Sequence, residues 1–256
     1  MDPVSAPARL IVSGPQEGAR NMALDSALME CMPAGGVPVL RLYAWSRPTL
    51  SLGYFQKPGE VADLDFAGRA GVDLVRRPTG GGAILHHLEL TLCLVLPAGH
   101  ALLEGSVPDS YLRLGRPVVE ALRGLGLEAS FRGGGAGERH AANCFSGLAC
   151  PDVVVGGRKI FGSAQRRRRQ AGLFHGSLLL DLDEALWRGV FGPNLGGGFT
   201  SLGRELGREA GWEDLAARIA GGYRGLLGDL REGSLEAAEA ERAAALEPSF
   251  SPPAAS

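Results

Sequence analysis

The stretch CFSGLACPDVVVGGRKIFGSAQ, residues 144–165, places two of the chain's four cysteines just ahead of a glycine-punctuated apolar segment with a single lysine. Within it, residues 152–164 form two apolar runs joined by Gly156-Gly157, a pattern that predicts a β-hairpin. Lys159 in the second run must either lead its ammonium to solvent or find an oxygen partner, because burying an unpaired charge is costly. Cys144 and Cys150 just before the hairpin leave three readings open, which are a nucleophile, a metal site or core packing.

Further strands and helices are expected on either side of this hairpin. Alternating apolar residues predict strands, and apolar residues at helical spacing predict helices. The expected strands are 37–45, 72–77, 83–97, 127–131 and 172–182, and the expected helices are 21–32, 108–126 and 212–227. We expect the helix over 108–126 to be interrupted near Gly115, with Pro117 starting a new turn. Together these elements predict an α+β (α/β) domain whose mixed, largely antiparallel sheet is flanked by helices.

The composition predicts an ordinary globular protein with one catalytic domain. Of its 256 residues, 45% are hydrophobic and 21% are charged. We place the domain over 1–232 and expect the Ala/Glu-rich residues 233–256 to form a disordered or frayed tail. A net charge of −2 argues against a nucleic-acid partner, because no basic excess is present to neutralise phosphates.

The sequence shows no pattern for export or membrane insertion. The N-terminus lacks a basic segment followed by an apolar run, and no uninterrupted apolar stretch is long enough to span a membrane. We therefore expect a cytoplasmic protein with no membrane partner, in which the four cysteines are reduced thiols. Its five histidines do not pair with the cysteines at metal-ligand spacing, so no metal site is predicted. Nothing in the pattern demands more than a monomer.

The segment RRPTGGGAILHH, residues 76–87, is the main candidate for ligand contact outside the hairpin. Its glycines would let the backbone approach a ligand and offer N–H groups to a carboxylate or carbonyl oxygen. The alternative is a glycine-rich hairpin with no ligand. Arg76 and Arg77 could likewise fix an anionic group or form a solvated strand end. The run Arg166–Arg169 is typical of a solvated loop, with docking of an acidic protein as the alternative.

Five blocks of the chain resemble a known family. NMALDSAL, VLRLYAWSRPTLSLGYFQ, VRRPTGGGAILHHLELT, GRKIFGSAQRR and HGSLLLDLD occur in the order and spacing of the lipoate/biotin protein ligase superfamily. Within it, the chain is most similar to the cysteine-dependent octanoyltransferases of lipoate assembly. The resemblance implies a class II synthetase-like and biotin-ligase-like domain with an acyl-binding tunnel. It also implies transfer of an eight-carbon acyl group to a lysine of a lipoyl carrier domain.

The resemblance also assigns residues. In these octanoyltransferases a Cys-Phe pair precedes the lysine of the Gly-Arg-Lys block by fifteen positions, and Cys144-Phe145 precedes Lys159 by the same number. Cys144 is therefore the expected nucleophile, Lys159 the expected group at the reacting carbonyl, and Cys150 a packing or neighbouring residue. The expected substrate-binding residues are Arg76, Arg77, Gly80, Gly81, Gly82, Ala83, His86, Gly162, Ser163, Ala164, His175 and Gly176. The acyl tunnel is expected to be lined by Leu50, Leu52, Ile84 and Leu85.

The implied donor is octanoyl-acyl carrier protein, and the implied acceptors are apo lipoyl domains or a glycine cleavage H-type carrier protein. Exchange of one thioester for another of similar energy requires no ATP, so no cofactor is expected. Two departures from the family pattern support a second hypothesis: the loop reads Gly-Gly-Gly-Ala as in lipoate ligases, and His86-His87 stands where His-Asp is common. That hypothesis is an ATP-dependent lipoate–protein ligase using ATP and Mg, with Cys144 as a bystander. A third is a non-catalytic accessory or docking protein.

Overall fold

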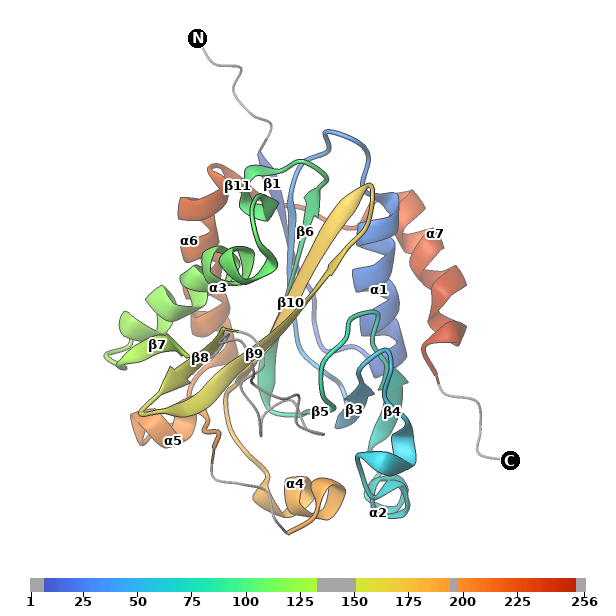
Figure 1. Ribbon diagram of the computed structural model, residues 1–256, viewed down its shortest axis with the longest axis vertical. Coiled ribbons are helices and arrows are strands. Elements are labelled where there is room, and N and C mark those ends of the chain that lie inside the picture. Colours follow the sequence, from blue (N-terminus) through green and yellow to red (C-terminus); the bar gives the residue numbers. More distant parts are fainter. Residues whose placement is uncertain (1–6, 133–150, 194–197, 252–256) are drawn as a thin grey trace.

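The computed structural model describes residues 7–132, 151–193 and 198–251. Figure 1 shows a large twisted sheet with helices on both faces and a smaller sheet beside its lower end. None of the helices in the described ranges is both long and apolar enough to span a membrane.

The large sheet contains eight strands in the order β11-β1-β2-β6-β10-β9-β8-β7. They are β1 (Ala8–Val12), β2 (Val39–Tyr43), β6 (Glu89–Pro97), β7 (Ala129–Arg132), β8 (Asp152–Val155), β9 (Arg158–Arg167), β10 (Ala171–Leu179) and β11 (Leu230–Glu232). Strand β1 pairs in parallel with β2 and β11, whereas the neighbouring pairs from β2 to β7 are antiparallel. The predicted mixed, largely antiparallel sheet is confirmed.

The predicted hairpin is also confirmed, because β8 and β9 pair on either side of Gly156-Gly157. Both glycines have positive φ angles, 56° and 77°, a conformation that glycine adopts without steric cost.

The strand expected over 83–97 is two strands in two sheets. Strand β5 (Ile84–His86) joins β3 (Thr49–Leu52) and β4 (Asp73–Arg76) in the small sheet, and β6 lies in the large one. The extended conformation is interrupted at Leu88, because its φ of 51° lies in the left-handed region. A strand cannot continue through that conformation. The break places the small sheet beside the start of β6, a central strand in the order of the large sheet.

Helices cover both faces of the large sheet (Figure 1). On one face lie α3 (Val107–Arg123) and α6 (Trp212–Leu227), and on the other lies α1 (Gly18–Cys31), with α7 (Ala237–Leu246) on its outer side. The shorter helices are α2 (Leu64–Arg69), α4 (Glu184–Phe191), α5 (Leu202–Leu206), η1 (Pro58–Glu60), η2 (Ala101–Leu103) and η3 (Glu247–Ser249).

The expected interruption of the helix near Gly115 is wrong. Helix α3 is continuous, with Pro117 inside it. Pro117 packs tightly against α6, because a Cβ added at Gly222 would lie 3.0 Å from the Pro117 Cβ. Close packing between the two helices therefore offsets the backbone hydrogen bond that proline cannot make.

The expected disordered or frayed tail is wrong for its described part, residues 233–251. Helix α7 lies in this segment and packs on α1, where Ala243 is fully buried beside Ala23 and Ala27. The Ala/Glu composition suggested disorder, but the alanines let the two helices approach closely. A capping box between Glu236 and Glu239 begins the helix.

Candidate functional site

Lys159 is buried and paired. Its side chain is 2% exposed, and its Nζ lies 2.8 Å from Oδ2 of Asp152, which is equally buried on β8. The hairpin brings the two groups together, because Lys159 on β9 pairs with Val154, which lies two residues from Asp152 on β8. Of the two alternatives for Lys159, the oxygen partner is correct and the water-facing edge lysine is wrong. The ion pair holds a positive charge at a fixed buried point.

A cavity lies farther along β9, where the strand carries small residues. It is lined by Met22, Tyr43, Arg77, Ile84, His86, Thr91, Gly162, Ser163, Ala164, His175, Gly176 and Ser177. Its volume is about 20 Å³, which is room for roughly one water molecule. A larger ligand would therefore require the lining side chains to move.

Arg77 is the centre of the loop that follows β4. Its Nη2 donates to the carbonyl oxygens of Gly80 at 2.8 Å and Gly82 at 2.6 Å, and its Nη1 donates to Ser51 O at 3.0 Å and Ser51 Oγ at 3.2 Å. The side chain is 2% exposed. Arg77 therefore ties the triple-glycine loop to β3, and is not the solvated strand end considered above.

The same loop is packed directly against Gly53. A Cβ added at Gly53 would lie 2.0 Å from the carbonyl oxygen of Gly81, so Gly53→Ala must displace the loop. We expect a loss of about 1–3 kcal/mol in the free energy of unfolding, which is typical of overpacking, measured by urea titration. Gly59→Ala is the matched control, because no atom lies within 4 Å of its added Cβ. Equal stability of the two variants would contradict this prediction.

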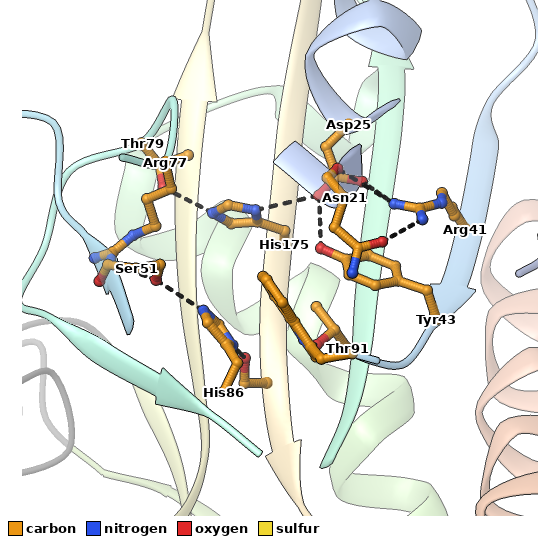
Figure 2. Close-up of polar contacts among 12 residues, drawn as sticks. Asn21, Asp25, Arg41, Tyr43, Ser51, Arg77, Thr79, His86, Thr91 and His175 are labelled. Atoms are coloured by element: carbon orange, nitrogen blue, oxygen red, sulfur yellow. Dashed lines mark hydrogen bonds and ion pairs between the residues drawn. The ribbon is translucent and has the colours of Figure 1, made fainter. Parts of the chain in front are cut away.

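His175 connects the loop to α1. Its Nε2 lies 2.7 Å from the Thr79 Oγ1, and its Nδ1 lies 3.6 Å from Oδ2 of Asp25 (Figure 2). Asp25 also accepts hydrogen bonds of 2.8 Å from Arg41 and from the Tyr43 hydroxyl, and all of these groups are buried.

Burial lowers the pKa of His175, and the neighbouring Asp25 only partly opposes that effect, so the imidazole is neutral at pH 7. Burial raises the pKa of the Asp25 carboxyl, but the hydrogen bond from His175 and the charge of Arg41 outweigh it. The net result is a pKa below the usual value, and Asp25 is a carboxylate.

These two shifts predict how stability depends on pH. The folded pKa of His175 lies below its unfolded value of about 6.5, so the unfolded chain binds more protons as the pH falls below that value. We expect the free energy of unfolding to decrease between pH 7 and pH 5, and again below about pH 3.8 as Asp25 titrates. Urea titrations of the wild type and His175→Gln check this. The variant should show a smaller decrease between pH 7 and pH 5, and an identical decrease would contradict it.

His86 forms a second buried cluster on the other side of Arg77. Its Nδ1 lies 2.8 Å from Oε1 of Glu89, and its Nε2 lies 2.7 Å from the Ser51 hydroxyl. The indole of Trp45 stacks on the imidazole with 3.9 Å between ring centroids and donates to Glu89 and Thr91.

A groove of about 230 Å³ lies on the far side of the Arg77–Pro78 turn, between α1 and the end of β9. Arg76 lines it and donates to the carbonyl oxygens of Gly53, Tyr54 and Gln56. The arginine run divides in two. Arg166 is half-buried and donates to the Pro78 carbonyl oxygen, whereas Arg167, Arg168 and Arg169 are exposed. The run is thus only partly the expected solvated loop, and docking of an acidic protein on it stays a prediction.

Cys144, the expected nucleophile, and Cys150 both lie outside the described residues. Of the two described cysteines, Cys93 is fully buried, and burial followed by the charge of Asp25 raises the pKa of its thiol well above the usual value. Burial and Glu239 likewise raise the pKa of Cys31. Neither thiol has the lowered pKa of a reactive cysteine.

Seven of the expected substrate-binding residues surround the cavity, namely Arg77, His86, Gly162, Ser163, Ala164, His175 and Gly176. Gly80, Gly81, Gly82 and Ala83 belong to the loop held by Arg77, and Arg76 lies at the groove. The expected tunnel lining stays a prediction. Ile84 lines the cavity, but Leu50, Leu52 and Leu85 pack in a core with Trp187.

Sequence reasoning missed Asp25, Asp152 and Thr79. A signal existed for the first two. Asp25 lies within an apolar helix and Arg41 within an apolar strand, so each charge requires a partner. Asp152 begins an apolar strand across a two-residue turn from Lys159. Thr79 carried no signal, because its partner His175 is distant in sequence. Within the described ranges, no three His, Cys, Asp or Glu side chains form a group that could hold a metal ion.

Comparison with known proteins places this geometry in a family. Residues 17–224 match the family model described as "Lipoyl protein ligase A/B catalytic domain". Octanoyltransferase LipM from Symbiobacterium thermophilum is 37% identical over 93% of this chain and 93% of its own length. Octanoyltransferase LipM from Carboxydothermus hydrogenoformans is 44% identical over 65% of this chain, a match that spans 62% of that relative and so less than two thirds of it.

The solved structures agree with the sequence comparisons. A crystal structure of lipoate-protein ligase A bound with ATP superposes with a TM-score of 0.81 and 26% identity, covering 94% of both chains. The resemblance drawn from the five sequence blocks is therefore confirmed, as is the lipoate-ligase type of fold. The chain belongs to the lipoyl protein ligase A/B catalytic domain family.

Proposed function

We propose that the protein is an octanoyltransferase of protein lipoylation. It transfers an octanoyl group from octanoyl-acyl carrier protein to a lysine of a lipoyl carrier domain, through a thioester on Cys144. The observation that carries this proposal is the 93% mutual coverage with a relative named as an octanoyltransferase. The acceptors are apo lipoyl domains or a glycine cleavage H-type carrier protein, and the protein acts as a monomer in the cytoplasm without a cofactor.

The reaction proceeds in two exchanges at one carbonyl carbon. The Cys144 thiolate attacks the donor thioester, a new carbon–sulfur bond forms, and the carrier protein's thiolate leaves and takes up a proton. The ε-amine of the acceptor lysine then attacks the enzyme thioester. The amide forms, the Cys144 thiolate departs, and the amine loses a proton. Cysteine suits both steps because its thiolate is a good nucleophile and a good leaving group.

Lys159 supplies the positive charge that both steps need. Its ammonium is fixed by Asp152 at 2.8 Å in a buried setting, where the low dielectric weakens screening, although the Asp152 carboxylate offsets part of the ammonium's field. There it lowers the pKa of the Cys144 thiol and stabilises the oxyanion that forms at the carbonyl carbon, aided by backbone N–H groups of the Gly80–Gly82 loop.

The cavity along β9 and β10 receives the octanoyl chain. Met22 and Ile84 give it an apolar wall, which favours a hydrocarbon over water. Because its volume is about 20 Å³, binding an eight-carbon chain requires the lining side chains to move.

The second candidate is an ATP-dependent lipoate–protein ligase. The Gly80–Gly82 sequence and the likeness to a ligase bound with ATP favour it. In that reaction ATP and Mg supply the activation, Lys159 contacts the carbonyl and phosphate of the acyl-adenylate, and Cys144 is a bystander. A purely accessory protein is disfavoured, because it would not need a lysine held in a buried ion pair.

One experiment separates the two enzymes. The full chain is incubated with octanoyl-acyl carrier protein and an apo lipoyl domain, with EDTA and no ATP, and the acceptor is analysed by intact-mass spectrometry. We expect the acceptor to gain one octanoyl group. A gain that appears only when free octanoate or lipoate, ATP and Mg are supplied would overturn the transferase in favour of the ligase.

A further inference from the structure

The triple-glycine loop, Gly80–Gly82, is held from both sides by two buried series of interacting side chains. Both series contain the same three kinds of group. Each series consists of a carboxylate, a histidine and a hydroxyl group. Figure 2 shows the series from Asp25 through His175 to Thr79, and the contact between His86 and Ser51. On one side, Asp25 and His175 lead to Thr79, which directly precedes the loop. On the other side, Glu89 and His86 lead to Ser51, which contacts the loop through Arg77. We call these the Thr79 relay and the Ser51 relay.

The Thr79 relay has a defined hydrogen-bond direction. An imidazole lone pair facing the Asp25 carboxylate would be repelled, so the neutral His175 carries its proton on Nδ1. Its Nε2 is then an acceptor, and the Thr79 hydroxyl donates to it at 2.7 Å. Asp25 is fixed in turn by Arg41 and Tyr43, so the relay anchors Thr79 to α1 and β2.

The Ser51 relay has the same order of groups, but it reaches the loop through one more residue, Arg77. The Ser51 Oγ accepts from Arg77 Nη1 at 3.2 Å, which leaves its hydrogen for His86 Nε2 at 2.7 Å. Glu89 lies 2.8 Å from His86 Nδ1. Arg77, once oriented, holds the carbonyl oxygens of Gly80 and Gly82. A flexible glycine segment is thereby fixed at three successive points, Thr79, Gly80 and Gly82.

We propose that the two relays are a positioning device for the triple-glycine loop, with Thr79 and Ser51 as positioning residues that act through the loop backbone. A loop of three glycines has more conformational freedom than any other sequence, yet a wall of the site must hold one geometry for its N–H groups to stabilise charge. The relays supply the rigidity that the glycines lack.

A hydrolytic triad is the obvious alternative for these atoms, but burial opposes it. Ser51 is 0% exposed and Thr79 is 1% exposed, and neither residue lines the cavity within the described part of the chain. A nucleophilic hydroxyl must reach its substrate. The two hydroxyl groups are therefore structural donors.

Hydrogen–deuterium exchange of the full-length protein tests the proposal. We expect Thr79→Val, which keeps the side-chain shape but removes the hydroxyl, to speed exchange of the Gly80–Gly82 amides by roughly 3- to 10-fold, the equivalent of one lost hydrogen bond. Ser51→Ala is expected to do the same through Arg77. Thr79→Ser restores the hydroxyl and should return exchange to within about twofold of the wild type.

Thr49→Val is the matched control. Thr49 is fully buried on β3, and its hydroxyl donates to the Arg47 carbonyl oxygen outside both relays. The proposal would be overturned if exchange of the Gly80–Gly82 amides were unchanged in Thr79→Val. It would also be overturned if Thr79→Ser or the control Thr49→Val accelerated that exchange as much as Thr79→Val does. The second readout, a matching decrease in kcat for octanoyl transfer, rests on the proposed function. The exchange readout does not, so the failure of one is distinguishable from the failure of the other.

Discussion

Cys144→Ala is expected to lower kcat for octanoyl transfer by at least about a thousandfold, because it removes the atom that carries the acyl group between donor and acceptor. Without that sulfur, the acceptor amine must attack the donor thioester directly. The measurement is the initial rate of acceptor octanoylation, followed by intact mass with octanoyl-acyl carrier protein as donor and no ATP.

Cys150→Ala is the control for this prediction, since it removes a neighbouring thiol from the same segment. We expect its rate to stay within about threefold of the wild type, the usual range for a residue outside the reaction. If Cys144→Ala stayed active, or if Cys150→Ala lost as much as Cys144→Ala, the assignment of the nucleophile by spacing would be wrong.

Lys159→Met is expected to have the second largest effect, a loss of at least about a hundredfold in kcat/KM, in the range measured for removal of one oxyanion-stabilising donor. It also leaves Asp152 buried without its ammonium partner, so the free energy of unfolding should decrease by about 3–5 kcal/mol. Steady-state kinetics and urea titration of the same variant give the two quantities.

A double variant separates catalysis from stability in this experiment. Lys159→Met combined with Asp152→Leu replaces the buried ion pair with apolar groups, and such replacements are often neutral or stabilising. We expect stability to recover while transfer stays lost. Lys57, the chain's other lysine, is 78% exposed, and Lys57→Met should change neither quantity. Transfer that recovered with stability would show that Lys159 is only structural.

The sequence predicted those elements whose signal is local. Two apolar runs around Gly156-Gly157 predicted the hairpin of β8 and β9, and the predicted position is correct. The family followed from five blocks in register, and the comparisons confirm it. Elements fixed by distant packing were predicted poorly. The composition of helix α7 predicted disorder, but Ala243 packs against Ala23 and Ala27 on α1. Helix α3 continues through Pro117 because α6 packs against it.

The residues of the candidate site likewise divide into those with a local sequence signal and those placed by distant contacts. The residues that line the cavity on β9 and β10 lie within the recognised blocks, so Gly162, Ser163 and His175 were found. Thr79 was not, because its role arises from a contact with His175, which lies 96 residues away along the chain. No periodicity encodes such a contact. The roles of Cys144 and of the substrate-binding residues stay predictions.

The most direct test of the central claim is to map the acyl-enzyme itself. The protein is mixed with octanoyl-acyl carrier protein, without acceptor and without ATP, quenched in acid, digested and analysed by peptide mass spectrometry. The account predicts an octanoyl group on Cys144 that disappears when an apo lipoyl domain is added before the quench. An octanoyl group on Cys150, or no acyl-enzyme while the acceptor still becomes octanoylated, would contradict it.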